Sequence, residues 1–106
     1  MKLKKYTSAE EAIAALNQRG FDRFFQFKGK NLQDLADERT YTPADLVMVE
    51  HHRFHHPKDW QNTVIIIALE DLLGNRGIVL SSYGQPQHMK LISFIDQVKV
   101  KSSIGA

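Results

Sequence analysis

Three apolar, β-branched runs in the middle of the chain constrain its fold more than any other feature. The runs are residues 46–55, 64–69 and 78–83. Composition of this kind is typical of strands, and the short turns between the runs favour antiparallel pairing. Val64–Leu69 is apolar at every position, as a strand buried on both faces should be. We therefore expect the stretch 45–84 to form an antiparallel meander.

Two amphipathic segments flank the meander. Ser8 and Glu11 fit a capping box ahead of an apolar stripe, and Thr7 and Glu10 offer the same pattern one residue earlier. Gly20 is suited to the left-handed end of a helix. The second segment opens with Pro86, and its apolar side chains recur at helical spacing. These side chains are Leu91, Phe94, Ile95 and Val98. We expect one helix at each end of the chain.

The remaining segments are read from the alternation of side chains along a strand. Residues 21–27 are expected to be a strand with Phe21, Phe25 and Phe27 on one face. In the run 46–55, the even-numbered residues, from Leu46 to Phe54, share one face and the odd-numbered residues the other. Residues 29–42 fit either a helical turn or a short edge strand, and the sequence does not decide between them.

The order of these elements predicts the fold class. A helix, a strand, an unassigned segment, three strands and a final helix indicate a single α+β domain over residues 1–106. We expect a two-layer sandwich, in which a mainly antiparallel sheet of four to five strands carries the N- and C-terminal helices on one face.

Composition excludes several classes of protein. The chain has no cysteine, so it forms no disulfide and no thiolate metal site. A net charge of +2 is too small to argue for nucleic-acid binding. The longest apolar run, Val64–Leu69, is too short to span a bilayer, and no apolar run follows the basic start of the chain. No nucleotide-binding loop is found. We expect a cytoplasmic protein without a cofactor.

A histidine cluster at the end of the run 46–55 is the strongest chemical signal. The cluster consists of His51, His52, His55 and His56. Alternation places His52 and His56 on the face of Glu50, and two imidazoles with a carboxylate can bind zinc. His52 and His56 are therefore candidate metal ligands. The alternative is a solvated strand end whose histidines titrate near neutral pH.

The same end of the sheet carries candidate ligand-binding residues. They are Glu50, His51, Arg53, His55 and Trp60. Tryptophan on a loop is common at binding surfaces, although a loop tryptophan also serves as an anchor onto the sheet. Arg53 could bind a ligand, or it could form a structural ion pair with a nearby acid.

A set of features runs through most of the chain in a characteristic order. The set is Arg19-Gly20-Phe21 after an alanine-rich helix, Pro43-Ala44-Asp45, Glu50, Arg53-Phe54, Asp59, residues 64–69, Gly74, Gly77 and Tyr83-Gly84. In this order the chain resembles a family of short uncharacterised bacterial proteins that are often labelled phosphoribosylpyrophosphate synthetase. The resemblance implies a small stand-alone α+β domain with no established activity. In phosphoribosylpyrophosphate enzymes, two adjacent acids are followed by a loop that cradles the phosphate. Glu70 and Asp71 are adjacent acids, but no such loop follows them.

The sequence supports two expectations about function. No catalytic motif is found, so the main expectation is a non-enzymatic module that binds a protein partner or associates with itself as a homodimer. The alternative is a protein that binds a small molecule, an anion or a metal, with or without enzymatic activity. Its site would lie at the Glu50–Trp60 end of the sheet.

Overall fold

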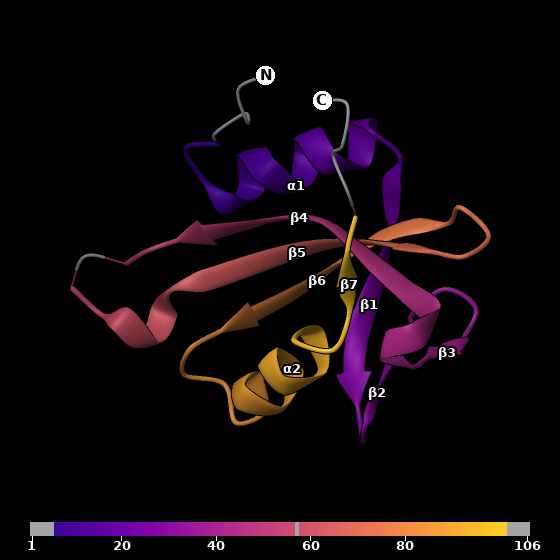
Figure 1. Cartoon of the computed structure of the whole chain (residues 1–106). Coiled ribbons are helices and arrows are strands. Elements are labelled where there is room, and N and C mark those ends of the chain that lie inside the picture. Colours follow the sequence, from indigo (N-terminus) through magenta and orange to yellow (C-terminus); the bar gives the residue numbers. More distant parts are fainter. Residues whose placement is uncertain (1–5, 57, 102–106) are drawn as a thin grey trace.

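A seven-stranded mixed sheet forms the centre of the protein, in the order β3-β2-β1-β6-β5-β4-β7 (Figure 1). The computed structural model describes residues 6–56 and 58–101. The strands are β1 Phe21–Lys28, β2 Asn31–Asp34, β3 Thr40–Tyr41, β4 Leu46–Phe54, β5 Val64–Asp71, β6 Arg76–Ser82 and β7 Lys99–Val100. The helices are α1 Ala9–Gln18 and α2 His88–Ile95, and two 3₁₀ turns, η1 Pro43–Asp45 and η2 Trp60–Asn62, precede β4 and β5.

The expected antiparallel meander is confirmed for β4, β5 and β6. The strands around the meander make the sheet mixed. β1 pairs in parallel with β6, and β7 pairs in parallel with β4. The segment 29–42, which the sequence left open, supplies the short strands β2 and β3, and β3 forms one edge of the sheet. The sheet therefore has more strands than expected and two parallel pairings that the sequence did not suggest.

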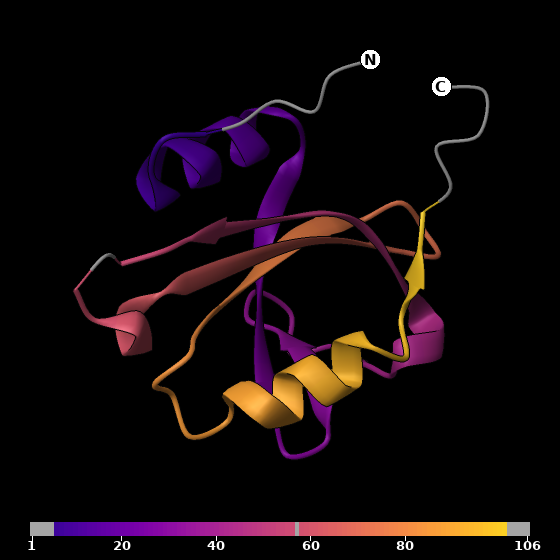
Figure 2. The same ribbon diagram turned by 60° about the vertical axis from the view of Figure 1, so that its left-hand side comes forward.

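The predicted two-layer sandwich is wrong, because the two helices cover opposite faces of the sheet. The sheet bends into a half-barrel around α2, and α1 lies across its other face (Figure 2). β5 shows the division, since Ile65 and Ile67 belong to the core cluster with α2, whereas Ile66 and Ala68 belong to the cluster with α1. A central strand that is apolar on both faces requires cover on both, and one helix on each face provides it.

Two irregularities in strand register overturn the predicted faces. In β1 the register shifts between Phe21 and Arg23, so Phe21 packs with the α1 cluster while Phe25 packs with the α2 cluster. In β4 the register shifts between Met48 and Glu50. A bulge of this kind adds a residue to one strand and reverses the alternation of side chains beyond it. The predictions of a single face for Phe21, Phe25 and Phe27, and for the even-numbered residues of β4, are therefore wrong.

The first helix has the ends that the sequence predicted. Ser8 Oγ accepts a hydrogen bond from Glu11 N at 3.1 Å, and Gly20 has a φ of 98°. Only this half of the predicted capping box forms, because the Glu11 carboxylate accepts from Thr7 N at 3.2 Å instead of from Ser8 N. The second helix is shorter than expected. It begins at His88 rather than at Pro86, and it ends at Ile95, so Val98 is buried from the turn beyond the helix. Among the described residues, no helix is long and apolar enough to cross a membrane.

Candidate interaction site

The bulge in β4 sends the predicted site residues to two different sides of the sheet. Beyond the bulge, Glu50 and His52 lie opposite Ala68 and Ile66, which face α1. His51 lies opposite Ile67 and Arg53 opposite Ile65, on the side of α2. The side chains that the sequence grouped into one site therefore form two separate groups.

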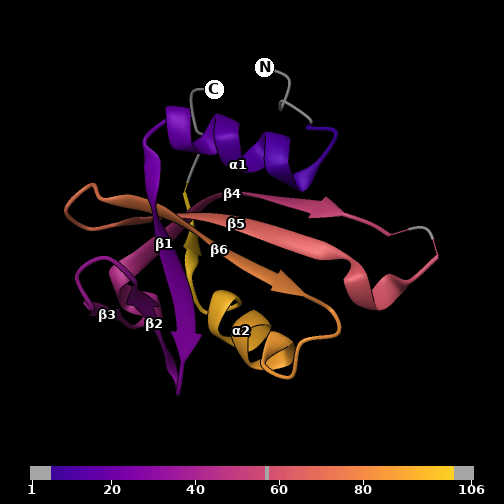
Figure 3. The same ribbon diagram turned by 180° about the vertical axis from the view of Figure 1, so that it is seen from behind.

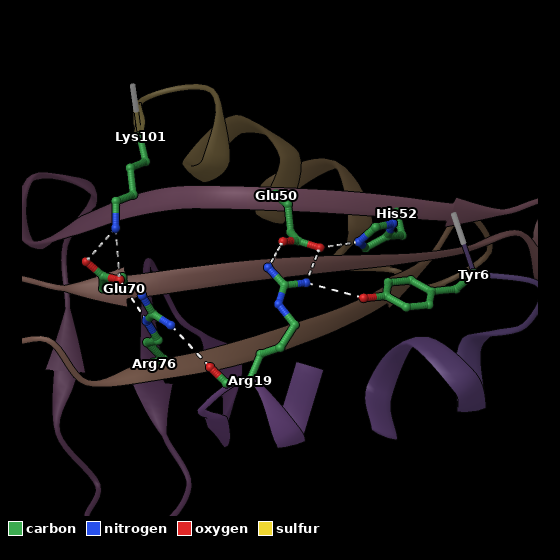
Figure 4. Close-up of polar contacts among 7 residues, drawn as sticks. All are labelled: Tyr6, Arg19, Glu50, His52, Glu70, Arg76 and Lys101. Carbon is green, nitrogen blue, oxygen red and sulfur yellow. Dashed lines mark hydrogen bonds and ion pairs between the residues drawn. The ribbon is translucent and has the colours of Figure 1, made fainter. Parts of the chain in front are cut away.

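The group on the α1 side is a closed polar network (Figure 4). The Arg19 guanidinium pairs with both oxygens of Glu50, with Nη1 donating to Oε2 at 3.0 Å, and it also donates to Tyr6 Oη at 3.3 Å. His52 Nε2 lies 2.6 Å from Glu50 Oε2, and the His52 ring meets the Tyr6 ring edge-on. This network ties the end of α1 to β4.

The charges of this network are balanced within the chain. Burial raises the pKa of Glu50, but hydrogen bonds from Arg19 and His52 outweigh burial and leave that pKa below its usual range. The hydrogen bond to Glu50 raises the pKa of Arg19 in turn. Glu50 and His52 therefore stabilise the contact between α1 and the sheet in this arrangement.

A second ion-pair cluster joins β5, β6 and the end of the described chain. Arg76 Nε donates to Glu70 Oε2 at 2.9 Å, and Lys101 Nζ lies 3.4 Å from the same oxygen. Arg76 Nη1 also donates to Arg19 O at 3.1 Å, so the cluster adjoins the network of Glu50 (Figure 4). Arg76 and Lys101 are thus engaged by neighbours and are poorly placed to bind an external anion.

The group on the α2 side is an open surface. Arg53 lies over the ring of Tyr83 with 5.9 Å between Cζ and the ring centroid, and the Trp60 ring lies 6.4 Å from the Tyr83 ring. Trp60 is 60% exposed. We call Arg53, Trp60 and Tyr83 the aromatic patch. Within residues 6–56 and 58–101, Arg53 forms no ion pair, so its charge is available to a partner.

The loop that carries Trp60 is held by its own hydrogen bonds. Asp59 Oδ1 accepts from Gln61 N at 3.2 Å, and Gln61 O accepts from Gly84 N at 2.9 Å. His56 Nδ1 accepts from Asp59 N at 3.0 Å. Gly84 allows this approach, because a Cβ there would lie 3.1 Å from Gln61 O. Trp60 is therefore an exposed side chain beside hydrogen bonds that hold the backbone around it, which lowers the entropy cost of binding through it.

The side chains of His52, His55 and His56 have different partners. His55 Nδ1 is 3.3 Å from Thr63 Oγ1, and the His56 ring accepts backbone N–H groups of its loop. His52 is bound to Glu50 on the other side of the sheet. In the part of the chain that the structure describes, no three His, Asp or Glu side chains are grouped so as to hold a metal ion. Metal binding by His52 and His56 stays a prediction.

Sequence reasoning missed two residues that organise these groups. Tyr83 joins Arg53 to Trp60, and Arg19 neutralises Glu50. The position of Tyr83 beside Trp60 could have been predicted from the sequence. The short β5–β6 turn places the end of β6 opposite the start of β5, next to the Trp60 loop. Arg19 could not be found in this way, because no sequence pattern shows that α1 crosses β4.

A groove of about 800 Å³ lies elsewhere, where β1 and β6 diverge beyond the pairing of Phe25 with Val79. The divergence of the two strands is visible in Figure 3. Phe24, Leu35 and Leu80 are exposed apolar residues of its lining. In its wall, Ser81 Oγ lies 2.8 Å from His88 Nδ1, and both residues are buried. Burial lowers the pKa of His88, which favours the neutral imidazole, and the contact with Ser81 ties α2 to β6.

No known protein family, curated protein or solved structure that was compared with this chain gives a significant match. The resemblance drawn from the sequence stays a prediction. Function is therefore argued from the geometry of the surface.

Proposed function

We propose that this protein is an interaction module that contacts a protein partner through the aromatic patch. The observation that carries the proposal is the exposure of Trp60 beside Tyr83 and Arg53, which forms no ion pair within the described residues. Tryptophan, tyrosine and arginine are the residue types that contribute most to binding energy at protein interfaces. The proposal includes a cytoplasmic location, which suits a chain without cysteine.

Replacing Trp60 separates a binding role from an anchoring role. We expect Trp60→Ala to change the free energy of unfolding by less than about 1 kcal/mol, because most of the side chain is already in water. An anchor would cost about 3 kcal/mol or more. The measurement is urea unfolding, and Ile66→Ala, which empties a fully buried site, provides the contrast.

A photo-crosslinking residue tests the role itself. Placed at position 60 and expressed in the protein's own cells, it should give a discrete adduct with a second protein. Leu73 is the matched control, because it is also exposed but lies on the turn between β5 and β6. Adducts at position 73 equal to those at position 60, or none at position 60, would contradict the proposal.

Self-association is a second form of the proposed role, and the groove between β1 and β6 favours it. Phe24, Leu35 and Leu80 are 39%, 54% and 41% exposed and lie along one concave surface. Uncovered apolar groups gathered in this way are typical of contact surfaces. A homodimer through the groove would bury them on both copies.

Sedimentation velocity over a wide concentration range tests the homodimer. We expect a dimer that Leu80→Lys weakens by about tenfold or more, since a buried unpaired charge opposes association. Leu73→Lys adds the same charge on the distant turn and should leave the dimer intact. A monomer at every concentration would rule out self-association and leave the partner-binding form unaffected.

The alternative from the sequence, binding of a small molecule or an anion, stays a proposal for the same end of the sheet. Arg53 and the rings of the aromatic patch offer a cation and flat apolar surfaces to such a ligand. Quenching of Trp60 fluorescence by a small carboxylate or phosphate, with saturation, would favour this alternative over a protein partner.

A further inference from the structure

Within the part of the chain that the structure describes, β4 has a free edge along its second half. β5 pairs with β4 along its length, whereas β7 pairs only with Val47 and Met48. Lys101 N donates to Met48 O at 2.8 Å, and no described segment pairs with β4 beyond that point on this side. We call residues 50–54 the β4 edge. An exposed strand edge presents unpaired backbone groups to which another extended chain can bind.

The positions of the unpaired groups follow from the register. Tyr83 N donates to Thr63 O across the β5–β6 pair, and backbone groups alternate between the two sides of a strand. The even-numbered residues of β5 therefore turn toward β4, where Val64 and Ile66 lie opposite Phe54 and His52. His51 and Arg53 consequently turn their N–H and C=O groups outward. This two-residue spacing is the one that an added strand requires.

The charges beside the β4 edge are mainly positive. Arg53 and Lys58 are exposed and form no ion pair within the described residues. Asp59, next to Lys58 in the sequence, accepts from Gln61 N and Asn62 Nδ2 and brings one negative charge, so Arg53 and Lys58 leave an excess of positive charge. Glu50 is on the other side of the sheet and is paired with Arg19. An acidic segment complements this edge, whereas the same edge of a second copy would repel it.

We infer that the β4 edge binds an extended, acidic segment of a partner chain as an added strand. The inference rests on the proposed interaction role and specifies the chemistry of the partner. Main-chain hydrogen bonds to His51 and Arg53 would hold the segment. Acidic side chains would meet Arg53 and Lys58, and apolar side chains would contact Trp60. Such a site selects by charge and extended conformation together.

A labelled synthetic peptide that alternates Glu and Val is the probe, and fluorescence anisotropy is the measurement. We expect saturable binding that weakens as salt is added, and no binding of the matching Lys–Val peptide. Arg53→Gln should weaken binding of the Glu–Val peptide by about tenfold, as for a charged contact of about 1.4 kcal/mol. Absence of Glu–Val binding, or equal binding of the Lys–Val peptide, would overturn the inference.

A second comparison tests strand pairing apart from charge. His51→Pro removes an outward N–H at an edge position where proline is tolerated, and His51→Ala removes the same side chain but keeps the N–H. We expect His51→Ala to bind the Glu–Val peptide like the wild type, and His51→Pro to bind it about tenfold more weakly. Matching urea midpoints will show that both variants fold.

Binding of a modified peptide to the wild-type protein also tests strand pairing, and it does not require His51→Pro to fold. N-methylation along both edges of the Glu–Val peptide keeps its charge, removes its backbone N–H donors and places methyl groups where the strands would meet, so binding should be lost. Binding that survives N-methylation would show attraction by charge alone and overturn strand addition. A positive crosslink at position 60 combined with failure of the Glu–Val peptide would leave the interaction role standing and overturn this inference alone.

Discussion

Replacing Asp71 with alanine should destabilise the protein by about 3 kcal/mol, the largest effect that we expect from removing one polar side chain. Asp71 is 5% exposed and accepts four hydrogen bonds. Oδ1 accepts from Leu73 N at 2.9 Å and Asn75 N at 2.8 Å, and Oδ2 accepts from Tyr41 Oη at 2.9 Å and Asn75 Nδ2 at 3.0 Å. The loss leaves several donors unpaired at the β5–β6 turn, and it releases β3 from the end of β5.

The contribution of Asp71 should also depend on pH. Burial raises its pKa, but the hydrogen bonds from Asn75, Tyr41 and Leu73 outweigh burial and lower the pKa below its ordinary value. A depressed folded-state pKa adds stability above the unfolded pKa of about 4, and this stability is lost as pH falls through the folded value. The difference in unfolding free energy between wild type and Asp71→Asn should therefore shrink as the pH is lowered from neutral to strongly acidic.

Urea unfolding across this pH range is the measurement. Asp22→Asn is the control, because Asp22 is exposed, and we expect its effect to stay within about 0.5 kcal/mol at every pH. An Asp71→Asn effect that is equally small, or that stays constant down to strongly acidic pH, would show that the carboxylate is not the acceptor described here.

The meander and the first helix could be predicted because their signals are local. Val64–Leu69 has an uninterrupted apolar pattern, and the Ser8 cap and Gly20 mark the ends of α1. Each of these features depends on neighbours within a few residues. The extra edge strands were left open because β2 and β3 are short, and they become strands by pairing with β1 and with each other.

The placement of the helices had a signal that was misjudged. Both faces of β5 are apolar, with Ile65 and Ile67 on one side and Ile66 and Ala68 on the other. This pattern already requires cover on both faces, so two helices on one face would have left an apolar face bare. The curl of the sheet had no such signal in the sequence, because it depends on the parallel β1–β6 pairing between segments that are far apart in the sequence.

The composition of the candidate site depends on a feature that alternation cannot show. Without the bulge between Met48 and Glu50, the side chains of Glu50 and His52 would share the face of Leu46 and Met48. The bulge turns them toward α1, where Arg19 binds Glu50, and it leaves Arg53 on the side of Trp60. The aromatic patch therefore results from one extra residue in β4, whose position no local pattern of apolar residues indicates.

Replacing Gly77 should test the least predictable part of the fold, the parallel contact between β1 and β6. A Cβ on Gly77 would lie 2.8 Å from Arg23 O and 2.8 Å from the Phe25 ring. Neither group can move aside easily, because Arg23 Nη1 is bound to the fully buried Asp34 at 2.6 Å and Phe25 is 4% exposed. We expect Gly77→Ala to cost about 3 kcal/mol and to speed amide exchange in β1 first.

Gly29→Ala is the matched control for this substitution. A Cβ at Gly29 has open space around it, but the φ of 66° is unfavourable for alanine. Its cost should therefore be about 1 kcal/mol and should come from conformation alone. Urea unfolding gives the free energies, and amide exchange locates the loss. If Gly77→Ala proved no more costly than Gly29→Ala, with β1 as protected as in the wild type, β1 could not lie against β6 in this register. The groove between the two strands would then lose its structural basis.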